Sequence, residues 1–311
     1  MSTKLISVVT PCYNEEANVQ ELYQRIKAVF DALPGYRYEQ IFIDNASKDG
    51  TVAVLRVLAA ADPNVKVIVN YRNFGHVRSP YHAVLAASGD AIIAMASDLQ
   101  DPPELIGRFL ERWEDGYRVV FGVKEESEET RLMFGIRESY YRFLAKIADV
   151  EVVRQSTGFG LYDRCVIEEL RRLSDPYPYV RGLVAELGYP SAKIPYRQPR
   201  RRRGITSQNF YSLFDVAMLG IVSHSKVPLR LATLTGFAGA VVSFCVGLVY
   251  LAYKLVFWDR FTVGVAPLLL GFFFLSSVQL GFVGIVGEYI GAIYSQVKQH
   301  PLVVEKERIN C

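Results

Sequence analysis

The sequence lacks the marks of several common protein classes. Its cysteines, Cys12, Cys165, Cys245 and Cys311, form no Cys-x-x-Cys pair, so neither a zinc site nor a disulfide framework is predicted. The N-terminus turns polar too soon after Leu5 for a secretory signal peptide, which favours a cytosolic N-terminal domain in a reducing compartment. A net charge of +3 is too small to indicate a nucleic-acid partner.

Glycine spacing gives no support for a dinucleotide cofactor, because Gly158-x-Gly160 lacks the third glycine of that fingerprint. Long charge-free runs are also absent from the first two thirds of the chain. The apolar content of 50% is instead concentrated in the last third, where it exceeds what an ordinary soluble enzyme carries. The chain is therefore expected to divide there.

The last third predicts a membrane hairpin. Leu231–Tyr253 carries no charge over 23 residues, and as a helix it spans about 35 Å, more than a hydrocarbon core of about 30 Å. A second uncharged stretch, 261–287, follows the turn at Asp259 and Arg260. We therefore expect two transmembrane helices within residues 229–291. The small residues Gly239 and Gly247 on the first helix are compatible with a homo-oligomer.

Flanking charges predict the orientation of this hairpin. The cations outside it are Lys226, Arg230, Lys298, Lys306 and Arg308, which outnumber Arg260 in the turn. Because positive charge is retained on the cytoplasmic side, we expect a multi-pass protein of the inner (plasma) membrane with both termini cytoplasmic. Residues 292–311 are then a cytosolic C-terminal tail.

The chain before the hairpin alternates between strand and helix patterns. Apolar strand-like runs lie at 5–10, 38–43, 65–69, 91–95, 118–123 and 158–163, with amphipathic segments between them. This alternation predicts an α/β domain over residues 1–203, with a doubly wound, mostly parallel sheet covered on both faces. The charged run Lys124–Thr130 has no apolar period and is expected to be a solvated loop.

Polar residues follow the strand ends, most clearly after 91–95. There Asp98 and Gln100 supply carboxylate and amide oxygens, which suit a hard cation carrying phosphates at the ligand-binding edge of such a sheet. The alternative is a capped turn, with Asp101 as the N-cap and Pro102 or Pro103 at the first helical position. We expect Asp101 to cap that helix rather than to bind metal.

A basic and amphipathic segment joins the domain to the hairpin. Arg200–Arg203 is a run of four arginines, and Asn209–Val222 has apolar residues at spacings of three and four. These features predict an interfacial amphipathic helix within 204–228; a helix that closes the soluble core is the alternative. The arginines could clamp an anionic substrate or attract anionic lipid headgroups, and both roles remain open.

Three motifs carry a resemblance to a known family. They are Val8–Glu16, Phe42–Thr51 and Ser97–Glu104, and Gly287–Gly291 adds a C-terminal signature. Together they resemble family 2 glycosyltransferases with the GT-A fold. Within that family the chain is similar to the polyisoprenyl-phosphate glycosyltransferases, which include dolichol-phosphate mannose synthase, and most of all to the bactoprenol glucosyltransferase (GtrB) branch.

The resemblance implies roles for individual residues. Pro11, Tyr13, Glu15 and Ser97 would line the nucleotide pocket, and Asp44 would accept a hydrogen bond from the uracil ring. Asp98 and Gln100 would hold Mg²⁺ or Mn²⁺ against the donor diphosphate. Arg131, with Arg201 or Arg202, would clamp the acceptor phosphate, because a guanidinium group offers forked donors. The chain departs from the family pattern at Ala96, where a first carboxylate is usual, and at Ser207, where a lysine is usual.

The implied reaction is an inverting, metal-dependent transfer of a hexose, glucose from UDP-glucose, to undecaprenyl or a similar polyprenyl phosphate. Another donor, GDP-mannose or UDP-GlcNAc, is an alternative within the same class. A processive polysaccharide synthase is disfavoured, because the chain has two spans and no Gln-x-x-Arg-Trp. The residue Ala96 motivates a third hypothesis, a catalytically silent membrane scaffold.

Overall fold

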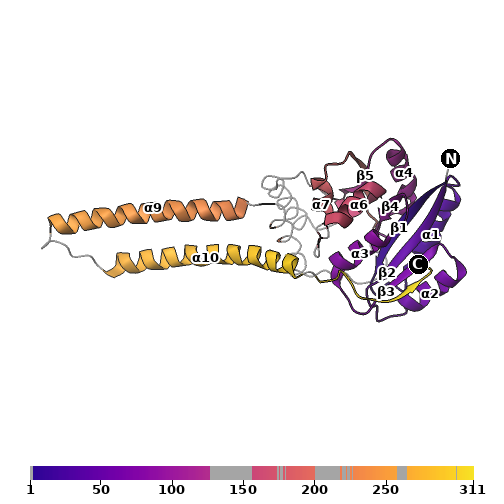
Figure 1. Ribbon diagram of the computed structural model, residues 1–311, viewed down its shortest axis with the longest axis horizontal. Coiled ribbons are helices and arrows are strands. Elements are labelled where there is room, and N and C mark those ends of the chain that lie inside the picture. Colours follow the sequence, from indigo (N-terminus) through magenta and orange to yellow (C-terminus); the bar gives the residue numbers. More distant parts are fainter. Residues whose placement is uncertain are drawn as a thin grey trace.

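The protein consists of an α/β domain from which two long helices project (Figure 1). The structure is a computed structural model. It describes residues 3–126, 156–173, 175, 178, 180–199, 218, 222, 225, 227–257, 265–298 and 300–311.

The described strands form a single mixed sheet in the order β7-β5-β6-β4-β1-β2-β3-β8. They are β1 (Lys4–Cys12), β2 (Tyr36–Asp44), β3 (Val65–Asn70), β4 (Ala91–Ala94), β5 (Val119–Glu126), β6 (Ser156–Asp163), β7 (Ser191–Arg197) and β8 (Glu305–Ile309). The pairs β1–β2, β1–β4, β2–β3 and β5–β7 are parallel. The pairs β3–β8, β4–β6 and β5–β6 are antiparallel. The expected parallel-dominated α/β sheet is confirmed.

Helices cover both faces of this sheet, as expected for a doubly wound domain. The described helices are α1 (Val19–Asp31), α2 (Thr51–Ala61), α3 (Gly75–Ala86), the 3-10 turn η1 (Pro103–Leu105), α4 (Ile106–Glu114), α6 (Arg164–Leu173) and α7 (Val180–Glu186). One core unites α1, α2 and α4 with alternate strand residues such as Val8 and Phe42. The other unites α3, α6 and α7 with the intervening residues, such as Val9 and Ile43.

Two strands at the edges of the sheet were not predicted from the sequence. In β7, Ile194 and Tyr196 are buried, but Pro195 between them interrupts the strand pattern, and proline is tolerated at a sheet edge because a main-chain donor is dispensable there. Strand β8 has mostly charged residues and therefore no apolar alternation. The expectation that Lys124–Thr130 is a loop is wrong for residues 124–126, which belong to β5; residues 127–130 lie outside the described part.

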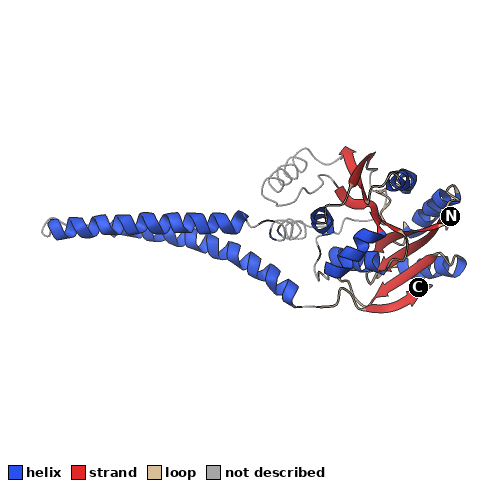
Figure 2. Cartoon of the chain, turned by 45° about the horizontal axis from the view of Figure 1, so that its top comes forward, coloured by secondary structure: helices blue, strands red, loops and turns tan. Residues whose placement is uncertain are grey.

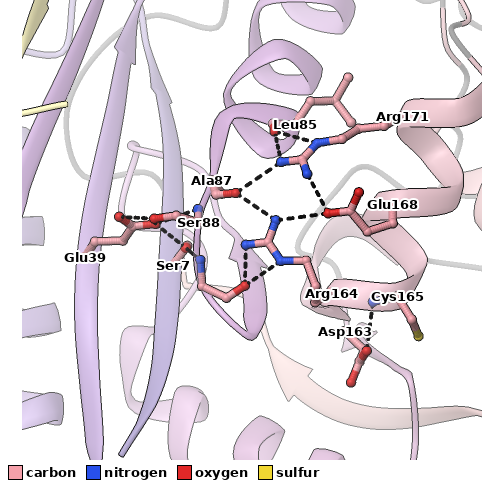
Figure 3. Close-up of polar contacts among 11 residues, drawn as sticks. Ser7, Glu39, Leu85, Ala87, Ser88, Asp163, Arg164, Cys165, Glu168 and Arg171 are labelled. Carbon is pink, nitrogen blue, oxygen red and sulfur yellow. Dashed lines mark hydrogen bonds and ion pairs between the residues drawn. The ribbon is translucent and has the colours of Figure 1, made fainter.

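A polar cluster secures α3 and β4 at the end of the sheet remote from the strand ends that carry the sequence motifs (Figure 3). The buried carboxylate of Glu39 accepts hydrogen bonds from the hydroxyl groups of Ser7 (2.5 Å) and Ser88 (2.8 Å). The guanidinium groups of Arg164 and Arg171, from α6, donate to main-chain carbonyls of Leu85, Ala87 and Gly89. The carbonyls of Leu85 and Ala87 lie at the C-terminal end of α3, where main-chain acceptors have no partner within the helix, and Gly89 lies in the connection that follows. The cluster therefore holds the connection into β4 in place.

The projecting helices are α9 (Val227–Val256) and α10 (Val265–Val297), which run side by side away from the domain (Figures 1 and 2). Their apolar side chains are exposed, with Phe237 at 72% and Leu280 at 71%. Val227–Val249 and Phe274–Val297, with mean hydropathies of 1.9 and 1.3, are each long and apolar enough to cross a membrane. The expected interfacial helix lies almost entirely outside the described residues.

The chain returns from α10 to the sheet. Strand β8 pairs antiparallel with β3, with Glu305 opposite Asn70 and Ile309 opposite Val67. The Arg78 guanidinium donates to the carbonyl of Pro301 just before β8. The segment expected to be a C-terminal tail, 292–311, thus contains the last turns of α10 and a strand of the sheet. The end of α10 is thereby tied to the α/β domain.

Candidate active site

The three sequence motifs converge where β1, β2 and β4 end. Cys12 and Asp44, the last residues of β1 and β2, are paired in register, and the amide of Met95 just after β4 donates to the carbonyl of Val9 on β1 (3.0 Å). In a doubly wound sheet, ligands bind in the crevice outside these carboxyl ends. The loops 11–16, 44–51 and 95–101 therefore share one edge of the domain.

Asp44 is fully buried at the end of β2. One of its oxygens, Oδ2, accepts a hydrogen bond from the main-chain N–H of Ser47 at 3.0 Å. The other, Oδ1, is buried and has no hydrogen-bond partner within the described residues. Burial raises the pKa of this carboxyl. Because an unpaired buried carboxylate oxygen is costly, Asp44 is suited to accept a hydrogen bond from a bound ligand.

The first loop combines partly exposed residues with a buried residue that holds the loop in place. Pro11 and Tyr13 are partly exposed. Glu15 is buried, its main-chain N–H donates to the Thr51 hydroxyl (2.9 Å), and its carboxylate accepts from the Asn18 amide (2.6 Å). The Glu15 carboxylate thus braces the entry to α1. Its predicted place in the nucleotide pocket remains a prediction, as do those of Pro11 and Tyr13.

Asn45, next to Asp44, has a structural role that was not predicted from the sequence. The side chain of Asn45 donates to Oδ1 of Asn73 at 2.8 Å and accepts from the main-chain N–H of Phe74 at 2.9 Å. These bonds hold the loop between β3 and α3 against the end of β2. The asparagine stands in a stretch typical of a turn, so its sequence context alone did not distinguish it.

Asp98 lies at the tip of the loop that follows β4. Its Oδ1 accepts a hydrogen bond from the main-chain N–H of Gln100 at 3.1 Å, and Oδ2 makes no hydrogen bond within the described residues. Leu99 adopts φ 61 and is buried, a left-handed conformation that is uncommon for a residue other than glycine. Burial of Leu99 leaves its neighbours Asp98 and Gln100 at the surface of the site.

Ser97 links this loop to the end of β1. It is buried and lies beside the Cys12 thiol, which donates to the carbonyl of Thr10 and whose pKa is raised chiefly by burial and then by Asp44. A thiol held neutral in this way is a packing element rather than a nucleophile. Ser97 therefore lies where the three motifs converge, and its contact with a nucleotide remains a prediction.

The expectation that Asp101 caps the following helix is wrong. The turn η1 begins at Pro103 after Pro102, without a side-chain cap. Asp101 is instead buried, and its carboxylate accepts hydrogen bonds from the main-chain N–H of Ala96 (2.9 Å) and the hydroxyl of Tyr196 on β7 (3.0 Å). Burial raises the pKa of Asp101 to about 6. The expected proline at the first helical position is confirmed.

Metal binding at this edge would need help from the substrate. Among the described residues, no group of three His, Cys, Asp or Glu side chains could hold a metal ion. Asp98 does offer one uncommitted carboxylate oxygen, and Gln100 uses its amide nitrogen to donate to the carbonyl of Pro199 (3.3 Å), which leaves the amide oxygen available. Two hard oxygen ligands fit Mg²⁺ or Mn²⁺ when phosphate and water oxygens complete the shell.

The residues predicted to bind the acceptor phosphate, Arg131, Arg201 and Arg202, lie outside the described residues. The nearest described position to the arginine run is Pro199, whose carbonyl receives the Gln100 amide. The described part of the site is therefore the part predicted to bind the donor.

Comparison with known proteins decides the family. Residues 7–171 match the family described as glycosyl transferase family 2. The chain belongs to this family. This glycosyltransferase is 36% identical over 299 residues to the uncharacterized glycosyltransferase YkcC of Bacillus subtilis, covering 96% of this chain and 92% of YkcC. It is 34% identical over 303 residues to the SfII prophage-derived bactoprenol glucosyl transferase of Shigella flexneri, covering 97% of each chain.

A comparison of structures gives a more distant likeness. The mannosyltransferase PcManGT of Pyrobaculum calidifontis, solved with GDP-Man and Mn²⁺, aligns over 94% of this chain and 86% of its own, with a TM-score of 0.49 and 16% identity. The glucosyl-3-phosphoglycerate synthase of Mycobacterium tuberculosis aligns over 70% of this chain and 78% of its own, with a TM-score of 0.45 and 20% identity.

Proposed function

We propose that this glycosyltransferase transfers a hexose, glucose from UDP-glucose, to the phosphate of undecaprenyl or a similar polyprenyl phosphate. The proposal draws on relatives named bactoprenol glucosyl transferase at 34% identity over nearly the whole chain. It also draws on the two exposed apolar helices, which suit an enzyme whose acceptor is a membrane lipid.

The observation that carries the proposal is the direction in which the site faces. The chain leaves α10 and enters β8 at Glu305, opposite Asn70 at the carboxyl end of β3. Since β1, β2 and β4 run parallel to β3, their carboxyl ends also point toward the base of the hairpin. The N-terminus lies at the opposite end of the domain (Figure 1). A donor bound at these strand ends would thus face the membrane side.

The described residues support a nucleoside diphosphate sugar as the donor. Asp44 presents a buried carboxylate oxygen without a partner in the described part, which suits the N–H group of a pyrimidine base. Asp98 and Gln100 present hard oxygens one loop away. A divalent cation held by them would supply positive charge to the departing diphosphate.

The acceptor needs little activation in this reaction. A phosphate monoester has a second pKa near about 6 and is already a dianion at neutral pH. One of its oxygens attacks the anomeric carbon, the bond from that carbon to the donor diphosphate breaks, and the nucleoside diphosphate leaves with the bonding electrons. Attack from the face opposite the leaving group inverts the anomeric configuration. The protein's task is to hold the two anions in line.

The fold also supports the proposed topology. Strands β1 and β8, from opposite ends of the chain, belong to the same sheet, so both termini must lie on one side of the membrane. Two crossings by α9 and α10 satisfy this requirement. The cations Arg230 and Lys298 flank the hairpin at its domain end, which favours a cytoplasmic location for the domain.

The test is a transfer assay with the full-length protein in detergent, undecaprenyl phosphate, Mg²⁺ and labelled UDP-glucose, UDP-GlcNAc or GDP-mannose in parallel. We expect a butanol-extractable labelled lipid carrying one sugar, with UDP-glucose as the preferred donor. A product from another donor alone would correct the sugar. A longer product would indicate a processive synthase. Binding of UDP without any transfer would overturn the proposal in favour of a silent scaffold.

A further inference from the structure

The loop that carries Asp98 is closed at its base by one buried carboxylate. Asp101 accepts a hydrogen bond from the main-chain N–H of Ala96 at 2.9 Å, which encloses the four residues 97–100. Its second oxygen accepts the hydroxyl proton of Tyr196 at 3.0 Å. Tyr196 belongs to β7, 95 residues further along the chain. The base of the loop is therefore hydrogen-bonded to β7, a strand that is distant from it in the sequence.

Tyr196 is itself held in place by burial and by the packing of its ring. The residue is 5% exposed, and its ring packs edge-on against Phe159 on β6 with 5.5 Å between ring centroids. Asp101 is 4% exposed. Because both partners are removed from water, the hydrogen bond between them is stronger than one at the surface and costly to leave unmade.

A second contact joins the same two segments. The Gln100 amide nitrogen donates to the carbonyl of Pro199, two residues after the end of β7. The loop is thus connected to the β7 segment at its base, through Asp101, and again at Gln100. Leu99, next to Gln100, has a left-handed conformation, which a chain keeps only where the surroundings enforce it.

We propose that Asp101 and Tyr196 are positioning residues that fix the 97–100 loop so that Asp98 and Gln100 present their oxygens to the donor diphosphate. This inference rests on the proposed function, because it assumes a donor at Asp98. Neither side chain is expected to touch the substrate. Each acts through the main chain of Ala96 and the loop that follows.

The decisive variant is Tyr196→Phe, which removes the hydroxyl and keeps the ring that packs on Phe159. Its matched control is Tyr81→Phe. Tyr81 is 2% exposed on α3 and donates one hydrogen bond to the carbonyl of Leu170 at 2.9 Å, in the core on the other face of the sheet. Each variant removes one buried hydroxyl group and keeps the aromatic ring. A purely structural effect should therefore appear in both.

We expect Tyr196→Phe to raise the donor KM and the Mg²⁺ concentration for half-maximal rate by about tenfold, the equivalent of one lost buried hydrogen bond. The KM for undecaprenyl phosphate should stay within about twofold, and Tyr81→Phe should leave all three at wild-type values. Hydrogen exchange of the 97–100 amides, measured without substrate, should be faster in Tyr196→Phe than in the wild type or in Tyr81→Phe.

A double-mutant cycle identifies the partner. If Tyr196 acts through Asp101, adding Tyr196→Phe to Asp101→Ala should change the donor KM by less than twofold, since the shared bond is already lost. Should Asp101→Ala fail to fold, Tyr196→Phe against Tyr81→Phe still decides. If the wild type is active and Tyr196→Phe and Tyr81→Phe have equal donor KM values, this inference is overturned and the proposed function stands. A wild type inactive with every donor would overturn the proposed function as well.

Discussion

Leucine side chains meet opposite surroundings in the two regions of this molecule. In the α/β domain, Leu22 on α1 and Leu55 on α2 are fully buried. In the hairpin, Leu234 and Leu280 are 66% and 71% exposed. The domain thus hides its apolar surface from water by packing it between sheet and helices, as a soluble protein does.

The hairpin instead presents its apolar surface outward along two helices. An exposed apolar surface of this extent is unusual on a soluble monomer and is expected where lipid replaces water. The difference separates two regions: the domain carries the polar strand ends of the candidate site, and the hairpin has the length and apolar surface suited to attachment to a membrane. Changes in each region should therefore affect different measurements.

The largest expected effect is a loss of glycosyl transfer without a loss of folding or of liposome binding. Asp98→Asn keeps the size of the side chain but removes its charge, so we expect glycolipid formation to fall at least about a hundredfold. The variant should unfold at the wild-type temperature and float with liposomes as the wild type does. Asp115→Asn, at the exposed end of α4, is the charge-matched control and should retain full activity. Wild-type turnover by Asp98→Asn would remove this residue from the site.

The next prediction compares the same leucine-to-alanine substitution in the buried core of the domain and on the exposed surface of the hairpin. Leu22→Ala, at a buried position of α1, should lower the free energy of unfolding of the domain by about 2–5 kcal/mol. Leu248→Ala on α9, where the leucine is 49% exposed, should change it by less than about 0.5 kcal/mol. Denaturant titration in a fixed detergent measures both. Similar losses in the two variants would mean that α9 packs as part of the soluble core.

The same contrast explains which elements were predictable from the sequence. Strands β1 to β4 are buried on both faces and therefore have continuous apolar runs, such as Val67, Ile68 and Val69 in β3. Strand β8 joins the sheet through main-chain bonds and ion pairs such as Arg56 with Glu307 (2.5 Å). Its charged sequence has no periodic signal, so nothing local could reveal it.

In the candidate site, too, some residues were predictable from the sequence and others were not. Asp98 and Gln100 were predicted as cation ligands from their residue type and their place after a strand, and in the structure they lie at the end of that strand. Asp101 was wrongly expected to cap a helix, because Asp-Pro-Pro-Glu is typical of a helix start. Its true partner, Tyr196, is 95 residues away. The spacing of neighbouring residues can predict a helix cap, but it carries no information on a contact between residues that are far apart in the sequence.

The smallest expected effect concerns the point where the two regions are joined. On β8, Glu305 accepts hydrogen bonds from Arg308 and from His82 on α3, both at 2.5 Å. The Arg308 guanidinium, aided by His82, lowers the pKa of Glu305 from 4.5 to about 2. A carboxyl with a lowered pKa stabilises the fold above its ordinary value, and that contribution is lost as the pH falls toward about 2.

We therefore expect hydrogen exchange of the β8 amides, normalised for the intrinsic effect of pH, to accelerate between about pH 4.5 and about pH 2 in the wild type. Glu305→Gln should show fast exchange already at pH 7 and little further change on acidification. The loss is about 1 kcal/mol or less, since these groups are partly solvated. Glu307→Gln on the same strand should retain the wild-type acid transition. If Glu305→Gln also retained it, the attachment of β8 would depend on its main-chain pairing with β3 instead.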